Sequence, residues 1–60
     1  MNNNTKPKYW VLSEGEEPYK LVFNEQDAFD SKAEFIDGFD ETGNLVVSYM
    51  FRNNMYTKDF

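Results

Sequence analysis

Residues 24–39 read NEQDAFDSKAEFIDGF, and the way this stretch folds decides the architecture of the 60-residue chain. Phe29, Ala33 and Ile36 follow one another at steps of four and three residues, a spacing that predicts an amphipathic helix with one apolar side. Asn24 is a good N-cap for this helix, and the acidic residues that follow it complement the helix dipole. The first expectation is therefore a single helix that starts at Asn24.

Other signals in the same stretch leave alternatives open. Residues 31–34, Ser-Lys-Ala-Glu, have the spacing of a capping box, so the helix would begin late or be broken near Asp30. Residues 34–39 also fit a strand that leads through a turn into the next strand, which gives an all-β meander. In the favoured interpretation the helix continues until Gly38 or Gly43 ends it.

Strand signals lie on both sides of this stretch. The predicted strands cover residues 9–12, 19–23, 45–51 and 55–58. Asn53 and Asn54 form a plausible two-residue hairpin loop, because Asn tolerates a positive φ angle. Tyr19, Leu21 and Phe23 alternate along the second strand and are expected to face the helix. The prediction is an α+β fold, a small antiparallel sheet in the order β-β-α-β-β with one helix packed on one face.

The chain is short enough to form only one domain. Residues 1–8 are polar and without periodicity, so they are predicted to be a flexible N-terminal arm, and residues 9–60 are predicted to be a single domain. The start has no apolar segment typical of a signal peptide, and no run approaches the length of a membrane-spanning helix. The expected location is the cytoplasm.

Composition excludes several kinds of function. The chain has no cysteine and no histidine, which removes thiolate chemistry, the commonest general base and the commonest metal ligand. Residues 37–44 superficially resemble a calcium loop, but Phe39 stands where a second ligand is needed. The net charge of −5 argues against direct binding of nucleic acid or an anionic membrane. We therefore expect no enzyme activity, no metal and no cofactor.

Acidic residues supply the main functional hypothesis. Ten of the eleven carboxylates lie between Glu14 and Glu41. If the helix is continuous, one side of it carries a stripe of acids at steps of three, four, three and four residues, namely Asp27, Asp30, Glu34, Asp37 and Glu41. Helix rise places neighbouring acids about 4.5 to 6 Å apart, close to the spacing of phosphates along a nucleic-acid strand. The stripe predicts an inhibitor that mimics nucleic acid and binds a basic, nucleic-acid-binding site of another protein.

A second hypothesis comes from the sheet face that one helix cannot cover. Apolar residues left on that face would form an interface, with Trp10, Val46, Met50 and Tyr56 as the candidates. The terminal edge from Met55 to Phe60 has few charged residues to prevent strand pairing. On this interpretation the chain is a structural or assembly module that docks through the open sheet face, or pairs with a second copy as a two-fold dimer.

In size and composition the chain resembles the very small, cysteine-free, Asn-rich acidic early proteins of bacteriophages. The resemblance extends over the whole chain and has no diagnostic motif. Such proteins commonly bind and inhibit a host enzyme or a defence system, and nucleic-acid mimics are one class among them. The resemblance thus implies a role in viral takeover of a host cell, exerted by binding a protein.

Overall fold

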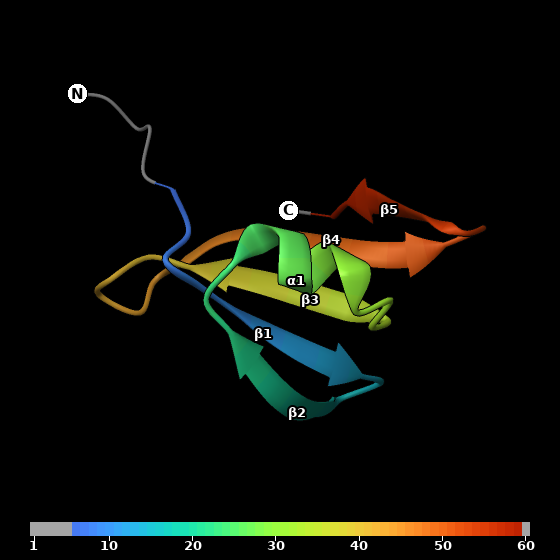
Figure 1. The fold of residues 1–60 in the computed structure, drawn as a ribbon, viewed down its shortest axis with the longest axis horizontal. Coiled ribbons are helices and arrows are strands. Elements are labelled where there is room, and N and C mark those ends of the chain that lie inside the picture. The colour runs from blue at the N-terminus through green and yellow to red at the C-terminus, as the bar shows by residue number, and fades with distance from the viewer. Residues whose placement is uncertain (1–5, 60) are drawn as a thin grey trace.

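The computed structural model describes residues 6–59 and has an α+β fold, a five-stranded antiparallel sheet with one short helix (Figure 1). The strands are β1 (Tyr9–Glu14), β2 (Glu17–Val22), β3 (Phe35–Phe39), β4 (Leu45–Arg52) and β5 (Met55–Lys58). The helix α1 (Glu25–Asp30) lies between β2 and β3 in the chain. The predicted fold class is confirmed, and the sheet contains one strand more than predicted.

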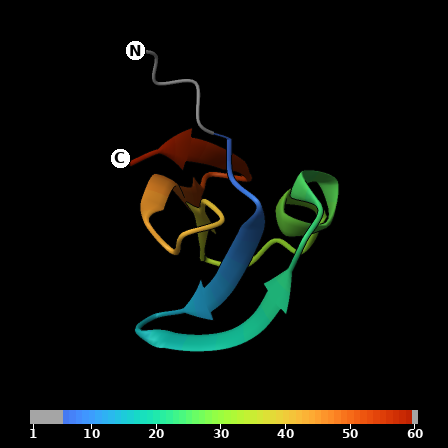
Figure 2. The same cartoon turned by 90° about the vertical axis from the view of Figure 1, so that its left-hand side faces the viewer.

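The strands lie in the order β2-β1-β3-β4-β5, and every neighbouring pair is antiparallel. Three of these pairs are hairpins between consecutive strands, and the remaining pair joins β1 to β3 across the helical connection. Figure 2 shows α1 to one side of the strands and the bend of β2 along its length. Because β2 and β5 are the outer strands, each leaves one side of its backbone without a strand partner in the described sheet.

The core lies between α1 and the face of the sheet that it covers. Its buried apolar residues are Trp10, Leu12, Ala28, Ala33, Ile36 and Val47. Phe29 of α1 adds aromatic contacts, with ring centroids 5.1 Å from Tyr49 and 5.2 Å from Tyr56. In a core with so few aliphatic residues, edge-on aromatic contacts supply a large part of the packing.

The helix starts as predicted but ends much earlier. The Asn24 side chain accepts a hydrogen bond from the Gln26 backbone N–H at 2.7 Å, as an N-cap does. After Asp30, the Ser31 hydroxyl donates to the Ala28 carbonyl at 2.6 Å, and Lys32 adopts a positive φ of 61°. A residue in the left-handed region cannot continue an α-helix. The expectation that the helix reaches Gly38 or Gly43 is therefore wrong, and the predicted break near Asp30 is where it stops.

The second half of the same stretch is strand β3. Ile36 is buried, whereas Phe35 and Asp37 on either side are only half-buried, which is the two-residue period of a strand. Gly38 lies against the rings of Pro7 and Trp10, where an added Cβ atom would come within 2.9 Å of each. The all-β alternative predicted a strand over residues 34–39, and that part of it is correct. Its prediction that the chain has no helix is wrong, because α1 is present.

The end of the predicted N-terminal arm is held against the sheet. The Lys8 backbone N–H donates to the Phe39 carbonyl at 2.6 Å, and Pro7 lies beside Gly38. These contacts extend the β1–β3 pairing by one residue. Residues 1–5 of the predicted arm, and Phe60 of the predicted terminal edge, lie outside the described residues.

The β4–β5 hairpin forms as predicted. Asn53 and Asn54 have φ angles of 55° and 63°, which is the conformation that a two-residue turn of this hand requires. The β3–β4 loop is organised by Asp40, whose carboxylate accepts hydrogen bonds from the backbone N–H groups of Thr42 and Asn44, both at 2.9 Å. Polar turn residues thus set the register of both connections of β4.

The C-terminal half of β2 faces the opposite way from the prediction. Val22 lies opposite Trp10 in the sheet, and Leu21 lies opposite Val11. Because Trp10 is buried under α1, its partner Val22 also faces the helix, so Leu21 points to the other side. A register irregularity between Leu12 and Ser13 changes the pairing further along the hairpin. The expectation that Leu21 faces the helix is therefore wrong, whereas Tyr19, at the irregularity, lines the hollow between α1 and β2.

Candidate interaction surface

The five acids of the predicted stripe do not share one face. Asp27 and Asp30 are on α1, where they line a hollow between the helix and β2 that Lys20 also borders. The remaining three, Glu34, Asp37 and Glu41, follow the end of the helix, on the α1–β3 connection, on β3 and in the β3–β4 loop. A helical rotation of about 100° per residue applies only while the chain is helical. The prediction of a continuous acidic stripe along one helix is therefore wrong.

Glu34 links two segments of the fold through hydrogen bonds. Its Oε1 atom accepts the Gly15 backbone N–H at 2.8 Å, while Oε2 of Glu14 accepts the Glu34 backbone N–H at 3.0 Å. This reciprocal pair of bonds ties the β1–β2 turn to the α1–β3 connection. Hydrogen bonds from backbone N–H groups to carboxylates are stronger than hydrogen bonds between neutral groups. Sequence reasoning missed the contact because the partners are nineteen and twenty residues apart.

Asp37 lies on the open face, meaning the side of the sheet turned away from α1. It stands between Val11 of β1 and Ser48 of β4 in the register, and it accepts the Ser48 hydroxyl at 2.6 Å through Oδ1. Phe35 and Met50 form the next cross-strand pair on the same face. One carboxylate therefore lies within a largely apolar part of the open face.

Glu41 is exposed in the β3–β4 loop, next to Asp40. The pKa of Asp40 lies below its ordinary value of 3.8, chiefly because its carboxylate accepts the Thr42 hydroxyl, with the Asn44 backbone bond as a further cause. These bonds favour the ionised form because a carboxylate accepts hydrogen bonds better than a neutral carboxyl does. Asp40 therefore stabilises the turn, at the other end of β3 from Glu34.

Three of the four predicted interface residues pack against the core instead. Trp10 is only 3% exposed because it lies under α1, and Val46 packs against the same cluster. The Tyr56 ring contacts Phe29, and its hydroxyl donates to the Ala33 carbonyl at 2.6 Å. Burial raises the pKa of Tyr56 above its ordinary value of 10.0. Met50 alone of the four lies on the open face.

Three of the five exposed large apolar residues in the described part of the chain lie along β2 and just after it. Tyr19, Leu21 and Phe23 are 53%, 47% and 76% exposed. We call these three residues the β2 edge. Pro18, which cannot donate a backbone hydrogen bond, stands near the start of the strand, as is typical of edge strands. That proline was the sequence signal for an edge, and an edge strand has fewer neighbours to cover its side chains.

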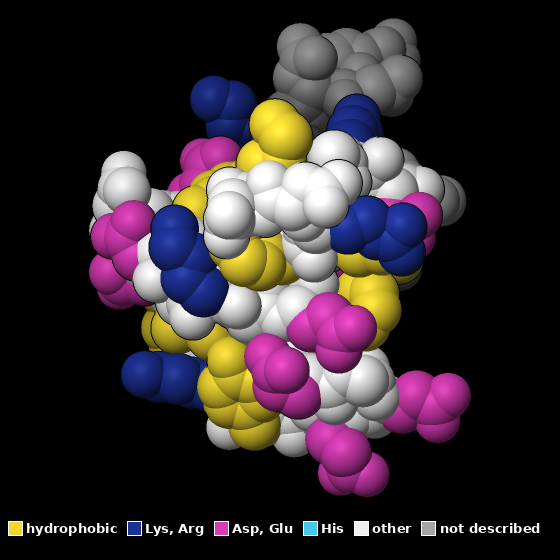
Figure 3. Space-filling view, turned by 90° about the vertical axis from the view of Figure 1, so that its right-hand side faces the viewer, with side chains coloured by type: hydrophobic (Ala, Val, Ile, Leu, Met, Phe, Trp, Pro, Cys, Tyr) yellow, Lys and Arg dark blue, Asp and Glu magenta, His cyan; other side chains and the backbone are white. Residues whose placement is uncertain are grey.

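Acidic side chains gather beside the β2 edge. Figure 3 shows the end of the molecule that contains the β1–β2 turn and the α1–β3 connection, with acidic side chains concentrated in its lower part. Four exposed acids belong to these two segments, namely Glu14, Glu16, Glu17 and Glu34. Within residues 6–59, each carboxylate hydrogen bond described above has a neutral donor. Their negative charge thus remains available to a partner.

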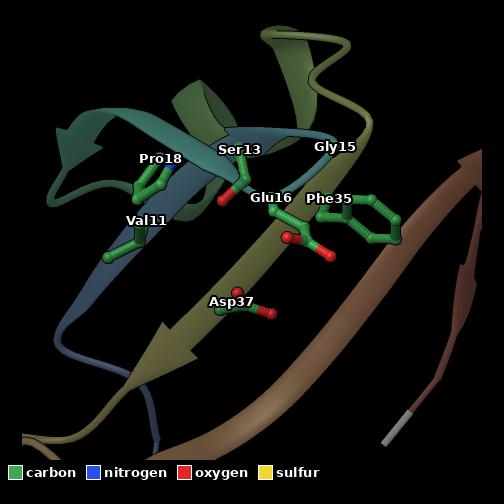
Figure 4. Close-up of a pocket in the computed structure, with 7 residues that line it drawn as sticks. All are labelled: Val11, Ser13, Gly15, Glu16, Pro18, Phe35 and Asp37. Carbon is green, nitrogen blue, oxygen red and sulfur yellow. The ribbon is translucent and has the colours of Figure 1, made fainter.

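A hollow on the open face lies between this acidic end and the middle of β3 (Figure 4). Its volume is about 360 Å³, which is at the lower end of the range for small-ligand sites. The residues that line it are Val11, Ser13, Gly15, Glu16, Pro18, Phe35 and Asp37. The carboxylates of Glu16 and Asp37 both lie at this hollow, although they come from a turn and a strand.

The described residues offer little to other kinds of site. Within residues 6–59 no group of three or more acidic side chains is arranged to hold a metal ion. The helix in that part of the chain has six residues, and no helix there is long and apolar enough to cross a bilayer. Comparisons of the chain with protein-family models, with curated proteins and with solved structures give no significant match.

Proposed function

We propose that this protein acts by binding another protein through the β2 edge, and that the bound segment of the partner is basic. The observation that supports this proposal is the exposure of Tyr19, Leu21 and Phe23 on an outer strand. Outer strands left open in this way accept an added strand, in which backbone hydrogen bonds supply affinity and alternate side chains supply specificity.

Charge supports a basic partner over a second copy of the chain. Each chain has a net charge of −5, with Glu16 just before β2 and Glu17 at its start. Two copies paired along this edge would therefore repel each other. A basic segment would instead be attracted to the acidic end and guided toward the edge.

This proposal changes the place of contact but keeps the predicted kind of partner. The nucleic-acid mimic required five acids on one helix, and α1 carries only Asp27 and Asp30 of them. The geometric support for a phosphate-like row is thereby lost. That the partner is a nucleic-acid-binding protein of a host cell stays a prediction from composition.

The test is capture of the partner from a lysate of the cells in which the protein is made. The immobilised chain is compared with the variant Tyr19→Ser/Leu21→Ser/Phe23→Ser, and bound protein is eluted with a salt gradient. We expect capture to fall at least about tenfold in this variant, since tenfold corresponds to about 1.4 kcal/mol and truncating a single aromatic hot-spot residue costs about 2 kcal/mol or more. The proposal also predicts elution at moderate salt because the contact is partly electrostatic.

A matched control uses the other exposed apolar residues. Leu45 and Met55 are 43% and 56% exposed but lie outside the β2 edge. The double variant Leu45→Ser/Met55→Ser should capture the partner as well as the unchanged chain does. Equal loss in both variants, or no loss in the β2-edge variant, would refute the proposal. A homodimer that the β2-edge variant abolishes would also refute it, by making the partner a second copy.

A further inference from the structure

The hollow on the open face combines an apolar wall with two carboxylates. Val11, Pro18 and Phe35 provide the wall, from three different strands. Glu16 reaches the hollow from the β1–β2 turn, and Asp37 reaches it from β3 (Figure 4). Apolar walls with a few converging polar groups are typical of sites that bind a ligand of defined shape.

Asp37 occupies the most informative position in this hollow. It is half-buried in the middle strand of the sheet, with Val11 beside it in the register and Phe35 two residues earlier on the same face. Its Oδ1 atom accepts the Ser48 hydroxyl, which satisfies only part of what a carboxylate can accept. A charge in largely apolar surroundings is costly unless it is paired. The open face thus presents a carboxylate that a cation would complement.

Ser13 adds a third polar side chain to the lining of the hollow. Its relative exposure is only 9%, and its side chain lies at the hollow in Figure 4. It lies opposite Pro18 on one side and Phe35 on the other. A hydroxyl at this position can accept a hydrogen bond from a donor that enters beside Asp37.

We propose that this hollow binds the guanidinium group of an arginine side chain from the partner protein. Asp37 and Glu16 would hold the charged group, and Phe35 would pack against its flat face. A planar guanidinium stacks on aromatic rings and bonds carboxylates with two parallel donors, whereas a lysine ammonium is more strongly hydrated. The inference rests on the proposed function, because it gives the basic partner one anchoring residue next to the β2 edge.

The test uses a single arginine derivative, so it does not require the partner. The isotope-labelled chain is titrated with N-acetylarginine methylamide at low ionic strength, and amide shifts are followed by NMR. Saturable changes confined to Val11, Ser13, Gly15 and Asp37 are expected. The corresponding citrulline derivative, which has the same shape without the charge, should produce no such changes. The corresponding lysine derivative is titrated in the same way. Equal responses to the arginine and citrulline compounds, or tighter binding of the lysine compound, would overturn the assignment.

Two variants and one control locate the binding. Asp37→Asn keeps an oxygen that can accept from Ser48 but removes the charge, and should weaken arginine binding about tenfold. Glu16→Gln lies in an exposed turn and should also weaken binding, so the inference remains testable if Asp37→Asn fails to fold. Asp27→Asn makes the same charge change on α1 and should leave the affinity unchanged within about twofold. Equal weakening in all three variants would show diffuse attraction only and contradict the site.

The outcome separates this inference from the proposed function. If the arginine derivative does not bind but capture of the partner still depends on the β2 edge, the hollow is not an arginine site and the docking proposal stands. If the derivative binds as expected but capture does not depend on the β2 edge, the docking proposal fails and the arginine site remains.

Discussion

The two outer strands of the sheet, β2 and β5, belong to hairpins of similar design but are held in place very differently. Each hairpin has a two-residue turn with a positive φ angle, at Gly15 in one hairpin and at Asn53 and Asn54 in the other. β5 is four residues long, and its Tyr56 reaches into the core side of the sheet. β2 is six residues long, and only Val22 at its end is half-buried.

This difference lies in how far the rest of the described chain covers each edge. The α1–β3 connection fastens β5, because the Tyr56 hydroxyl bonds the Ala33 carbonyl and the ring packs on Phe29. On β2 the apolar side chains gain little from the fold, since Tyr19 and Leu21 remain about half exposed. The docking proposal assigns these exposed apolar residues to contact with another molecule.

The largest expected effect comes from replacing the same residue type on each outer strand. Tyr56→Ala should lower the free energy of unfolding by about 2–4 kcal/mol, because it removes an aromatic ring packed on the core. Tyr19→Ala should change it by about 0.5 kcal/mol or less, as exposed substitutions usually do. Urea denaturation followed by tryptophan fluorescence measures both. Similar losses for the two variants would contradict the distinction between the strands.

A smaller effect is expected at the turn of the β1–β2 hairpin. Gly15 has a φ of 61°, and no atom lies within 4 Å of the position that a Cβ would take. Gly15→Ala should therefore cost about 1 kcal/mol from backbone strain alone. Thermal unfolding of this variant, compared with Glu16→Ala in the same turn, measures the cost. No difference between the two would show that the turn relaxes freely.

The Tyr56 hydroxyl gives a smaller and pH-dependent effect. Tyr56→Phe should cost about 1 kcal/mol near neutral pH, the usual contribution of one hydrogen bond. Because burial raises the pKa of Tyr56 above 10.0 in the folded state, the unfolded chain loses this proton first as pH rises. Stability should therefore fall as pH rises above about 10. The fall should be shallower in Tyr56→Phe, and equal slopes would contradict the buried setting of the hydroxyl.

The smallest effect concerns the β3–β4 loop, which connects two inner strands of the sheet. The lowered pKa of Asp40 means that its ionised form contributes stability above the ordinary value of 3.8, and that this contribution disappears as pH falls through the folded-state pKa. Asp40→Asn should make unfolding less sensitive to acid in that range. A pH series of denaturation curves measures this, and an unchanged acid slope would show that the loop bonds do not favour the carboxylate.

Local sequence signals predicted much of the fold on which this comparison of the outer strands depends. Asn24 as N-cap and the Asn53-Asn54 turn each depend on residues close in sequence, and each is found in the structure. The class of fold followed from them, because strand and turn signals leave few ways to arrange so short a chain.

The parts that sequence could not supply depend on contacts between distant residues. The spacing of Phe29, Ala33 and Ile36 is equally compatible with a helix and with a short helix followed by a strand. Pairing of β3 between β1 and β4 decided the outcome. The side of β2 that faces α1 was set by the pairing of Val22 with Trp10, which no local pattern reveals. The acidic stripe failed with the helix on which it depended, and the hollow at Asp37 required the same long-range pairing.

The most direct test of the β2 edge as the docking site is amide hydrogen exchange in the captured complex. Exchange in residues 17–22 should slow at least about tenfold when the partner binds, because new backbone hydrogen bonds protect their amides. Exchange in residues 55–58 should stay as it is in the free chain. Slower exchange in residues 55–58 with no change in residues 17–22 would contradict the account.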